Sequence, residues 1–330
     1  MTHGVLAPQR SMFTSRRTVN GSRLSPSPSP WVRPADWLPI TPPVPSDKRI
    51  VGLHAVQNGG SNFVRVTCRG AYRVDWGDGA GWVNYADNTP AEKNLSWGDY
   101  SSGTLTAAGY RQAIIMVEAQ AGQNLTQVYL NERHSASSQT YGTGWLDVAI
   151  ASSSTVDLRI TGFSGVTHPM LERFTCDASL TSVGPSFSQS YALRSVSLDT
   201  SSVTNFTNMF AFCYSLQTVP ALNTAAGTNF TAMFQNCYSL QTVPALNTAA
   251  GTNFTNMFYS CYSLQQSDIT GTTYTISYAS ANLSAAALNN IYTKLGTAAG
   301  ARTITVTSNW GTAGDDPTIA TAKGWTVAGS

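Results

Sequence analysis

Apolar positions in the second half of the chain recur with a period of 24 residues. A fixed period of this length is typical of a solenoid, in which each coil packs only on its neighbours. The first copy carries its apolar residues at Phe206, Met209, Phe210, Cys213, Leu216, Val219 and Leu222. They return as Phe230, Met233, Phe234, Cys237, Leu240, Val243 and Leu246, and a third copy begins at Phe254, Met257, Phe258, Cys261 and Leu264 before the pattern drifts.

Each repeat contains two different spacings of apolar residues. Phe-x-x-Met-Phe-x-x-Cys places them at i, i+3, i+4 and i+7, which predicts one face of a short helix. Leu-x-x-Val-Pro-x-Leu predicts a short extended strand, because proline does not fit a helix interior. Gly227 and Gly251 then mark turns. We therefore expect a helix, a turn and a strand per repeat, and we expect the repeats to stack, because one alone buries too little apolar surface to offset its ordering entropy.

Partial repeats extend the same pattern toward the N-terminus. One copy lies 23 residues before the first full repeat, at Phe187, Tyr191, Leu193, Val196 and Leu198. A shorter coil is indicated before that by Phe174, Leu180 and Val183. The predicted solenoid therefore occupies residues 151–275.

The consensus of these coils resembles a known repeat family. Asn-Phe-Thr-x-Met-Phe-x-x-Cys-x-Ser-Leu-x-x-Val-Pro-x-Leu-Asn-Thr, within residues 165–270, resembles the leucine-rich repeats of the BspA type. Such repeats occur in bacterial surface proteins and in bacteriophage virion proteins. The resemblance implies a right-handed solenoid used for adhesion or recognition, with no catalytic residues.

Residues 46–150 show short alternating segments with turn signals between them. Residues 50–66 alternate around Gly59-Gly60, and residues 72–76, 110–117 and 125–130 predict further strands. Such a series favours a β-sandwich. With the solenoid and a C-terminal α/β cap, the expected fold class is a β-rich α+β protein with an extended N-terminal arm, an immunoglobulin-like sandwich and a leucine-rich-repeat solenoid.

One motif of this region resembles a second family. Val74-Asp75-Trp76-Gly77-Asp78-Gly79 resembles the signature of PKD-type immunoglobulin-like domains, although a His-x-Tyr partner strand does not follow it. The resemblance implies a spacer or a module that contacts carbohydrate or protein. We interpret Asp75 and Asp78 as turn residues whose carboxylates accept backbone N–H groups. A calcium site and a catalytic acid pair are the alternatives.

Residues 1–45 differ in composition from the rest of the chain. Five arginines, Arg10, Arg16, Arg17, Arg23 and Arg33, precede the first acidic residue, Asp36. The segments 25–30 and 41–45 are proline-rich and predict extended backbone that is disordered in a free monomer. We interpret this arm as an anchor held by other proteins of an assembly. A flexible tail and a nucleic-acid-binding arm are the alternatives.

Residues 276–330 predict a cap over the open end of the solenoid. Ser284 is the expected N-cap of a helix whose apolar face is Leu288, Ile291, Tyr292 and Leu295, and Gly296 ends it. Residues 303–307 and 325–327 predict strands, and Asp316-Pro317 predicts the start of a short helix between them.

Composition narrows the class of protein. Charged residues are only 11% of the chain, and the net charge of +2 gives no indication of a nucleic-acid partner. Cys213, Cys237 and Cys261 share one repeat position and are interpreted as buried thiols, with disulfides between neighbouring coils as the alternative. Residues 1–19 are polar and show no secretory signal, and no run reaches transmembrane length.

No catalytic motif, metal-ligand set or cofactor-binding loop is recognisable in the sequence, so we expect neither enzyme activity nor a cofactor. Asn205, Asn229 and Asn253 begin Asn-x-Thr sequons, but their repeat position favours a capping role over glycosylation. The candidate binding surface is an exposed stripe of Gln217, Thr218, Gln241 and Thr242.

The sequence therefore favours a bacteriophage virion protein, such as a tail fibre or other peripheral appendage exposed on the particle. The arm would bind other virion proteins, in several copies of a symmetric assembly. The solenoid would bind a host cell-surface polysaccharide or protein, without nucleic-acid or membrane partners. A capsid decoration protein (head fibre) and a bacterial surface adhesin are the alternatives.

Overall fold

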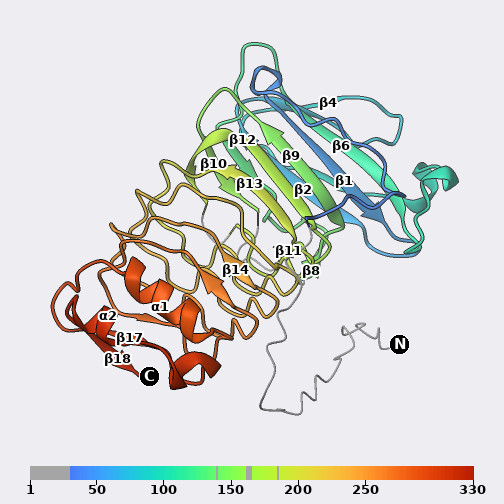
Figure 1. Cartoon of the computed structure of the whole chain (residues 1–330). Helices are drawn as coiled ribbons and strands as arrows, with labels where there is room; N and C mark the ends of the chain where they lie inside the picture. The colour runs from blue at the N-terminus through green and yellow to red at the C-terminus, as the bar shows by residue number, and fades with distance from the viewer. Residues whose placement is uncertain (1–29, 139, 161–165, 184–185) are drawn as a thin grey trace. The chain divides into compact units, whose positions relative to one another are not determined.

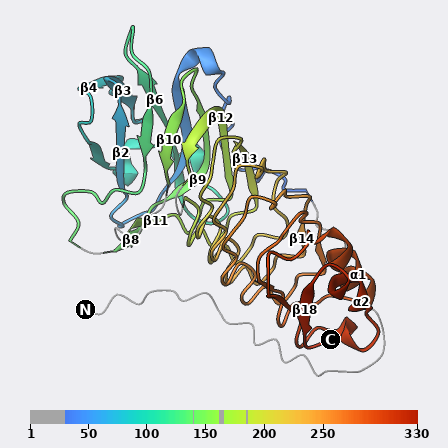
Figure 2. The same cartoon turned by 90° about the vertical axis from the view of Figure 1, so that its left-hand side faces the viewer.

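The computed structural model describes residues 30–138, 140–160, 166–183 and 186–330 of the chain (Figures 1 and 2). In this part the protein is rich in β-structure and contains few helices. Its first strands are β1 (Arg49–Val56), β2 (Phe63–Arg69), β3 (Tyr72–Asp75), β4 (Val83–Tyr85), β5 (Ala91–Asn94), β6 (Arg111–Ala119), β7 (Gln127–Tyr129), β8 (Tyr141–Gly142) and β9 (Trp145–Ala151). The later strands are β10 (Val156–Arg159), β11 (Val166–Thr167), β12 (Arg173–Ser182), β13 (Ser195–Asp199), β14 (Thr242–Val243), β15 (Gln266–Ser267), β16 (Ile276–Ser277), β17 (Arg302–Thr305) and β18 (Trp325–Ala328).

Within the described ranges, helices are confined to short 3-10 turns and the C-terminal region. The α-helices found there are α1 (Ala285–Lys294) and α2 (Thr318–Thr321). The 3-10 turns are η1 (Pro45–Asp47), η2 (Trp97–Asp99), η3 (Ser102–Thr104) and η4 (Trp310–Ala313).

Most strands belong to one hydrogen-bonded path. The order is β4-β3-β6-β1-β9-β12-β10-β7-β2-β5, and β13 pairs with β12 off this path. Strands β4, β3, β6, β1 and β9 pair antiparallel, whereas β9, β12 and β13 pair parallel. Parallel pairing between successive coils is what a solenoid produces, so β12 joins the antiparallel sheet to the first coil.

The expected strands of the first half are present. The predicted turn at Gly59-Gly60 separates β1 from β2, and the segments expected at 72–76, 110–117 and 125–130 form β3, β6 and β7. Side chains from both arms of the sheet path, among them Ile50, Val66, Val74 and Val128, belong to one buried core. The alternation of apolar and polar residues was therefore sufficient to place these strands.

Residues 31–48 lie against the face of β1, β6 and β9. The indole N–H of Trp37 donates to the Tyr110 hydroxyl (3.1 Å), and the backbone N–H of Leu38 donates to Gln112 Oε1 (2.8 Å). Trp37, Leu53, Ala55, Tyr110 and Leu146 form a second buried cluster there. Of the expected arm, residues 31–45 are thus part of the folded unit, and residues 1–29 lie outside the described residues.

A buried carboxylate links three parts of this unit. Asp147 on β9 is fully buried and forms ion pairs with Arg33 and with Arg173, the first residue of β12. The Arg173 Nε lies 3.0 Å from Asp147 Oδ1. The arginine side chains are 24% and 22% exposed, so most of each side chain is withdrawn from water. Asp147 therefore ties residues 31–48 and the start of the solenoid to the same strand.

Replacing Asp147 by alanine is expected to lower the free energy of unfolding by about 3 kcal/mol, because two largely buried guanidinium groups lose their counter-charge. Chemical denaturation of the purified variant measures this loss. Arg69→Ala is the matched control, since the Arg69–Asp87 pair is half exposed and should contribute less than about 1 kcal/mol. Equal losses in the two variants would contradict the role given to Asp147.

The coils of the solenoid are built from turns, not from the short helices that the sequence predicted. Alternate N–H groups donate to the next coil, as in Phe206 N to Asn229 O (2.8 Å) and Phe210 N to Met233 O (2.9 Å). The intervening N–H groups close turns within the coil, as in Met209 N to Phe206 O (3.2 Å). Positive φ angles at Asn208 and Phe212 break any helical run. The helix prediction was wrong because these N–H groups bond to carbonyl groups on a neighbouring coil. The spacing of residues within one repeat contains no information about that coil.

The apolar repeat positions form ladders inside the solenoid. Phe230 lies between Phe206 and Phe254, with ring centroids 5.3 Å apart on both sides and the planes within 2° of parallel. A Cβ atom added at Gly251 would lie 2.4 Å from Phe254 Cζ and 3.0 Å from Phe230 Cε2. The glycine expected at a turn is therefore also needed for close packing of the rings.

The cysteine ladder is confirmed as a row of buried thiols. All five cysteines of the chain are buried and unpaired. The Cys237 thiol donates to Phe210 O (3.0 Å) on the previous coil, and Cys213 and Cys261 make equivalent bonds. Burial raises the pKa of the Cys261 thiol to about 12, so it stays protonated at neutral pH.

The C-terminal cap follows the sequence prediction closely. The Ser284 hydroxyl accepts from Ala287 N (3.1 Å) at the start of α1, and Leu288, Ile291 and Tyr292 form its buried face. Strands β16, β17 and β18 continue the parallel stacking in a separate three-stranded sheet. The cap therefore covers the last coil with a helix and ends the ladder of buried rings, since Tyr278 stacks on Phe258 at 4.8 Å.

Candidate functional site

The predicted polar stripe lies on a ladder of stacked coils. Gln241 N donates to Gln217 O (2.8 Å), and the Thr242 hydroxyl donates to that of Thr218 (3.1 Å). Gln217 and Thr218 are exposed, whereas Gln241 and Thr242 are half-buried. The structure therefore brings the four predicted residues together in two adjacent rows. Gln265 continues the glutamine row, because its N–H donates to Gln241 O (2.8 Å).

A row of stacked tyrosines stands beside the glutamine row, and in the three full repeats each tyrosine lies three residues before a glutamine. Tyr191, Tyr214, Tyr238 and Tyr262 stack with centroids 4.9, 5.0 and 5.9 Å apart and with planes within 6° of parallel. Each tyrosine occupies the second position of a tight turn, such as the one closed by Leu216 N to Cys213 O (3.2 Å). The turn directs the ring outward, and exposure reaches 57% at Tyr262. We call these four residues the tyrosine ladder.

The candidate surface predicted from the sequence does not include the tyrosine ladder. The signal was present, because a tyrosine follows the cysteine position in all three full repeats and Tyr191 matches it one step earlier. Tyrosine is intermediate between buried and exposed residue types, however, so the periodicity alone gave no reason to place these rings outside the core. The exposed turn position was needed to separate them from the phenylalanine ladders.

The surface around the two rows carries no formal charge along the three full repeats, whereas in the coil of Tyr191 the exposed Arg194 takes the position of the glutamines. Residues 200–267 contain no Asp, Glu, Lys, Arg or His, so the three full repeats are entirely uncharged. Burial, and next the neighbouring phenols of Tyr238 and Tyr191, raise the pKa of Tyr214, which keeps that hydroxyl protonated at neutral pH. The surface therefore offers amides, hydroxyls and aromatic edges, and it has no charge with which to attract an ionic ligand.

Asp75 and Asp78 act as turn residues, as interpreted from the sequence. Asp75 Oδ1 accepts from Gly77 N (2.9 Å), and Asp78 Oδ1 accepts from Ala80 N (3.1 Å). Asp78 also forms an ion pair with Lys93, and hydrogen bonds from Lys93 and Ala80 hold its pKa below the usual range against an opposing effect of burial. These contacts give both carboxylates a structural role in the turns.

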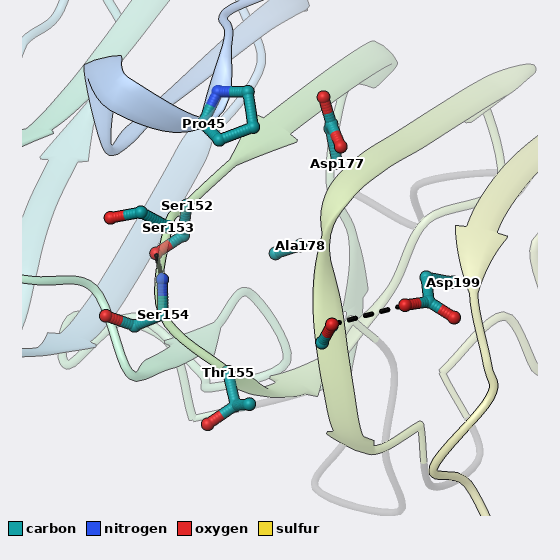
Figure 3. A pocket seen from close by; sticks show the side chains of 9 residues that line it. Pro45, Ser152, Ser153, Ser154, Thr155, Asp177, Ala178 and Asp199 are labelled. Carbon is teal, nitrogen blue, oxygen red and sulfur yellow. Dashed lines mark hydrogen bonds between the residues drawn. The ribbon is translucent and has the colours of Figure 1, made fainter.

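A hollow of about 280 Å³ lies beside the middle of β12 and the end of β13 (Figure 3). It is lined by Pro45, Ser152, Ser153, Ser154, Thr155, Asp177, Ala178, Ser179 and Asp199. Asp199 accepts from the Ser179 hydroxyl (3.2 Å) and from Ser201 N (3.0 Å), while the Ser152 hydroxyl donates to Leu125 O (3.1 Å). Because several of its polar groups are engaged within the protein, we assign this hollow no role.

Two histidines are buried near each other, away from the solenoid surface. His54 Nε2 accepts from Gly144 N (3.0 Å), and His168 contacts the Thr143 hydroxyl and Ile160 O. Burial lowers the pKa of His54 to about 3 and that of His168 to about 4. Both side chains are neutral and tightly packed, which makes them core residues.

The five arginines of the predicted arm are only partly within the described residues. Arg33 has an internal partner, Asp147, and its guanidinium carbon lies 5.5 Å from the centroid of the Trp37 ring. Arg10, Arg16, Arg17 and Arg23 lie outside the described residues.

Among the described residues, no group of three or more His, Cys, Asp and Glu side chains is placed to hold a metal ion. The same residues contain no helix long and apolar enough to cross a lipid bilayer.

Comparison with known proteins finds a similarity in the repeat region. Residues 182–290 match the family described as "Mycoplasma protein of unknown function, DUF285". No curated protein and no solved structure matches the chain. The matched residues include the three full coils and the start of the cap. Together with the solenoid of stacked turns, this match fits a BspA-type repeat protein.

Proposed function

We propose that this chain is a structural protein of a bacteriophage particle, a tail fibre or similar peripheral appendage that binds the host surface. The observation that carries the proposal is the repeated, uncharged polar surface around Gln217, Thr218, Gln241 and Thr242. A solenoid presents identical groups at a regular spacing, which suits a repetitive ligand such as a surface polysaccharide. The interior is filled by stacked rings and thiols, so the outer surface is what remains for binding.

In this proposal the three parts of the chain have separate roles. Residues 1–29, with four arginines, bind other virion proteins, and residues 31–48 fix this anchor to the sheet through Trp37 and the Arg33–Asp147 pair. The strands β1–β7 serve as a PKD-like spacer. If the arm binds to the head of the particle in place of the tail, the protein is a capsid decoration protein.

Replacing Gln217 and Gln241 together by arginine is expected to weaken attachment to host cells while leaving the melting temperature nearly unchanged. Two long charged side chains would obstruct the row. Gln217 is exposed and Gln241 is half-buried, so both side chains reach the surface, where substitutions usually change stability by less than about 0.5 kcal/mol. Binding of the labelled protein to cells or purified envelope measures the effect. The matched control is Ala225→Arg with Ala249→Arg, which adds the same charge at exposed positions on another turn of the coils. If the glutamine variant attaches as well as wild type, the binding surface lies elsewhere.

Deleting residues 1–29 is expected to leave a folded protein of unchanged melting temperature that no longer joins the particle. The internal contacts of Arg33 and Trp37 remain in this variant, so its stability should be preserved. Deletion through residue 40 is the comparison, and it should lower the melting temperature because it removes the buried Trp37. Particles that carry the shorter deletion at normal copy number would exclude the anchor role.

A bacterial surface adhesin is the second candidate. The specific observation in its favour is the match of residues 182–290 to a Mycoplasma family. Locating the protein by antibody on intact particles and on bacterial cells distinguishes the two candidates.

A further inference from the structure

We propose that the tyrosine ladder is the contact line for an uncharged, 1,4-linked polysaccharide chain that lies along the solenoid, one sugar ring per coil. This inference rests on the proposed binding function and names its ligand class and its residues.

The spacing of the ladder is the first argument. The centroids of neighbouring rings lie 4.9, 5.0 and 5.9 Å apart. This spacing is close to that of hydrogen-bonded strands, because the rings are carried by stacked coils. A 1,4-linked chain of pyranose rings repeats at nearly the same interval. One hydroxyl or ring edge of successive sugars can therefore meet one phenol of successive coils without strain accumulating along the chain.

The orientation of the rings is the second argument. Because the rings are stacked face to face, the inner rings present their edges and hydroxyl groups outward, not their faces. A tyrosine hydroxyl both donates and accepts a hydrogen bond, as sugar hydroxyls do. The stack also holds each ring in place before a ligand arrives, which reduces the entropy lost on binding.

The neighbouring side chains are the third argument. Gln217, Gln241 and Gln265 follow the tyrosines by three residues on the same coils, and Ser215 and Ser239 stand beside them in the same turns. Primary amides and hydroxyls are suited to bind the ring oxygens and hydroxyls of a sugar. The predicted glutamine row and the tyrosine ladder thus become two sides of one contact line.

The absence of charge along the three full repeats, next to Arg194 in the coil of Tyr191, selects the class of ligand. Residues 200–267 carry no ionisable group other than tyrosine and cysteine, so an acidic polysaccharide or a nucleic acid would lose hydration without gaining a counter-charge. A neutral glycan has no charged group that must lose its hydration on binding. Binding should accordingly be insensitive to salt, in contrast to binding that depends on phosphate or carboxylate groups.

The test uses the full-length protein and titration calorimetry with hexamers of 1,4-linked glucose and of 1,4-linked N-acetylglucosamine, with polygalacturonate as the acidic comparison. We expect at least one neutral hexamer to bind with an affinity that does not change with salt, and its dimer to bind at least about tenfold more weakly because it spans fewer rungs. Tyr214→Phe with Tyr238→Phe keeps the stack but removes two hydroxyls, and it should weaken binding about tenfold. Tyr259→Phe is the matched control, because Tyr259 is exposed but occupies the repeat position of Ala211 and Gln235, outside the ladder.

Three results would overturn the inference. They are binding of neither neutral hexamer, salt-sensitive binding of polygalacturonate in their place, and equal affinity of the wild type and the Tyr214/Tyr238 variant. If the hexamers fail while cells are still bound and the glutamine variant loses that attachment, only the ligand class is wrong. If the glutamine variant attaches normally, the proposed solenoid surface itself fails.

Discussion

Replacing Phe230 by alanine should lower the free energy of unfolding by about 3–5 kcal/mol, because it removes the centre of a three-ring stack from a fully enclosed site. Phe230 has no exposed surface, and it contacts a ring on the coil before it and a ring on the coil after it. The loss of each aromatic contact adds to the destabilisation that comes from the loss of buried area. Denaturant titration followed by tryptophan fluorescence and by circular dichroism measures the change.

The position of Phe230 makes its effect larger than that of a residue at the end of the ladder. In a solenoid, stability comes from interfaces between neighbouring coils, so a central residue supports two interfaces at once. Tyr259→Ala is the control on the next coil, because its ring is 58% exposed, and the change should stay within about 0.5 kcal/mol. A loss below about 1 kcal/mol for Phe230→Ala would show that the phenylalanine ladder does not stabilise the solenoid.

The sequence was most informative where a structural constraint recurs along the chain. The 24-residue period identified the buried ladders, including the partial copy at Phe187, which stacks on Phe210 at 5.6 Å. The cap at Ser284 was also predictable, because capping depends on residues a few positions apart. The turn roles of Asp75 and Asp78 were predictable for the same reason.

The features that the sequence did not predict depend on contacts between distant residues. The Phe-x-x-Met-Phe-x-x-Cys segment has a helical spacing, yet its N–H groups find partners 23 residues away on the next coil. The Arg33–Asp147 pair joins positions 114 residues apart, so composition alone assigned Arg33 to an arm outside the fold. The tyrosine ladder was missed because its outward direction follows from the turn geometry and not from residue type.

Acidification from pH 6.5 to 4.5 is expected to lower the free energy of unfolding by about 5 kcal/mol through the two buried histidines. Burial lowers the pKa of His54 to about 3 and that of His168 to about 4, with the ordinary value at 6.5. Below pH 6.5 both histidines become protonated in the unfolded chain. In the folded protein they stay neutral until the pH falls to their lowered pKa values. Each pH unit in this window therefore removes about 1.4 kcal/mol per histidine. This stabilisation is complete above pH 6.5 and is lost as the pH falls.

Single glutamine variants separate this effect from the titration of carboxylates. His54→Gln and His168→Gln have no imidazole to protonate, and each should remove about half of the pH dependence between 6.5 and 5, where most carboxylates remain ionised. The His54 variant keeps a side-chain acceptor for Gly144 N, which limits its loss of stability at neutral pH. Urea unfolding of the three proteins at intervals of half a pH unit gives the slopes directly. The prediction is contradicted if neither variant reduces the wild-type dependence of the free energy of unfolding on pH. The two histidines would then not be the cause of the protein's acid sensitivity.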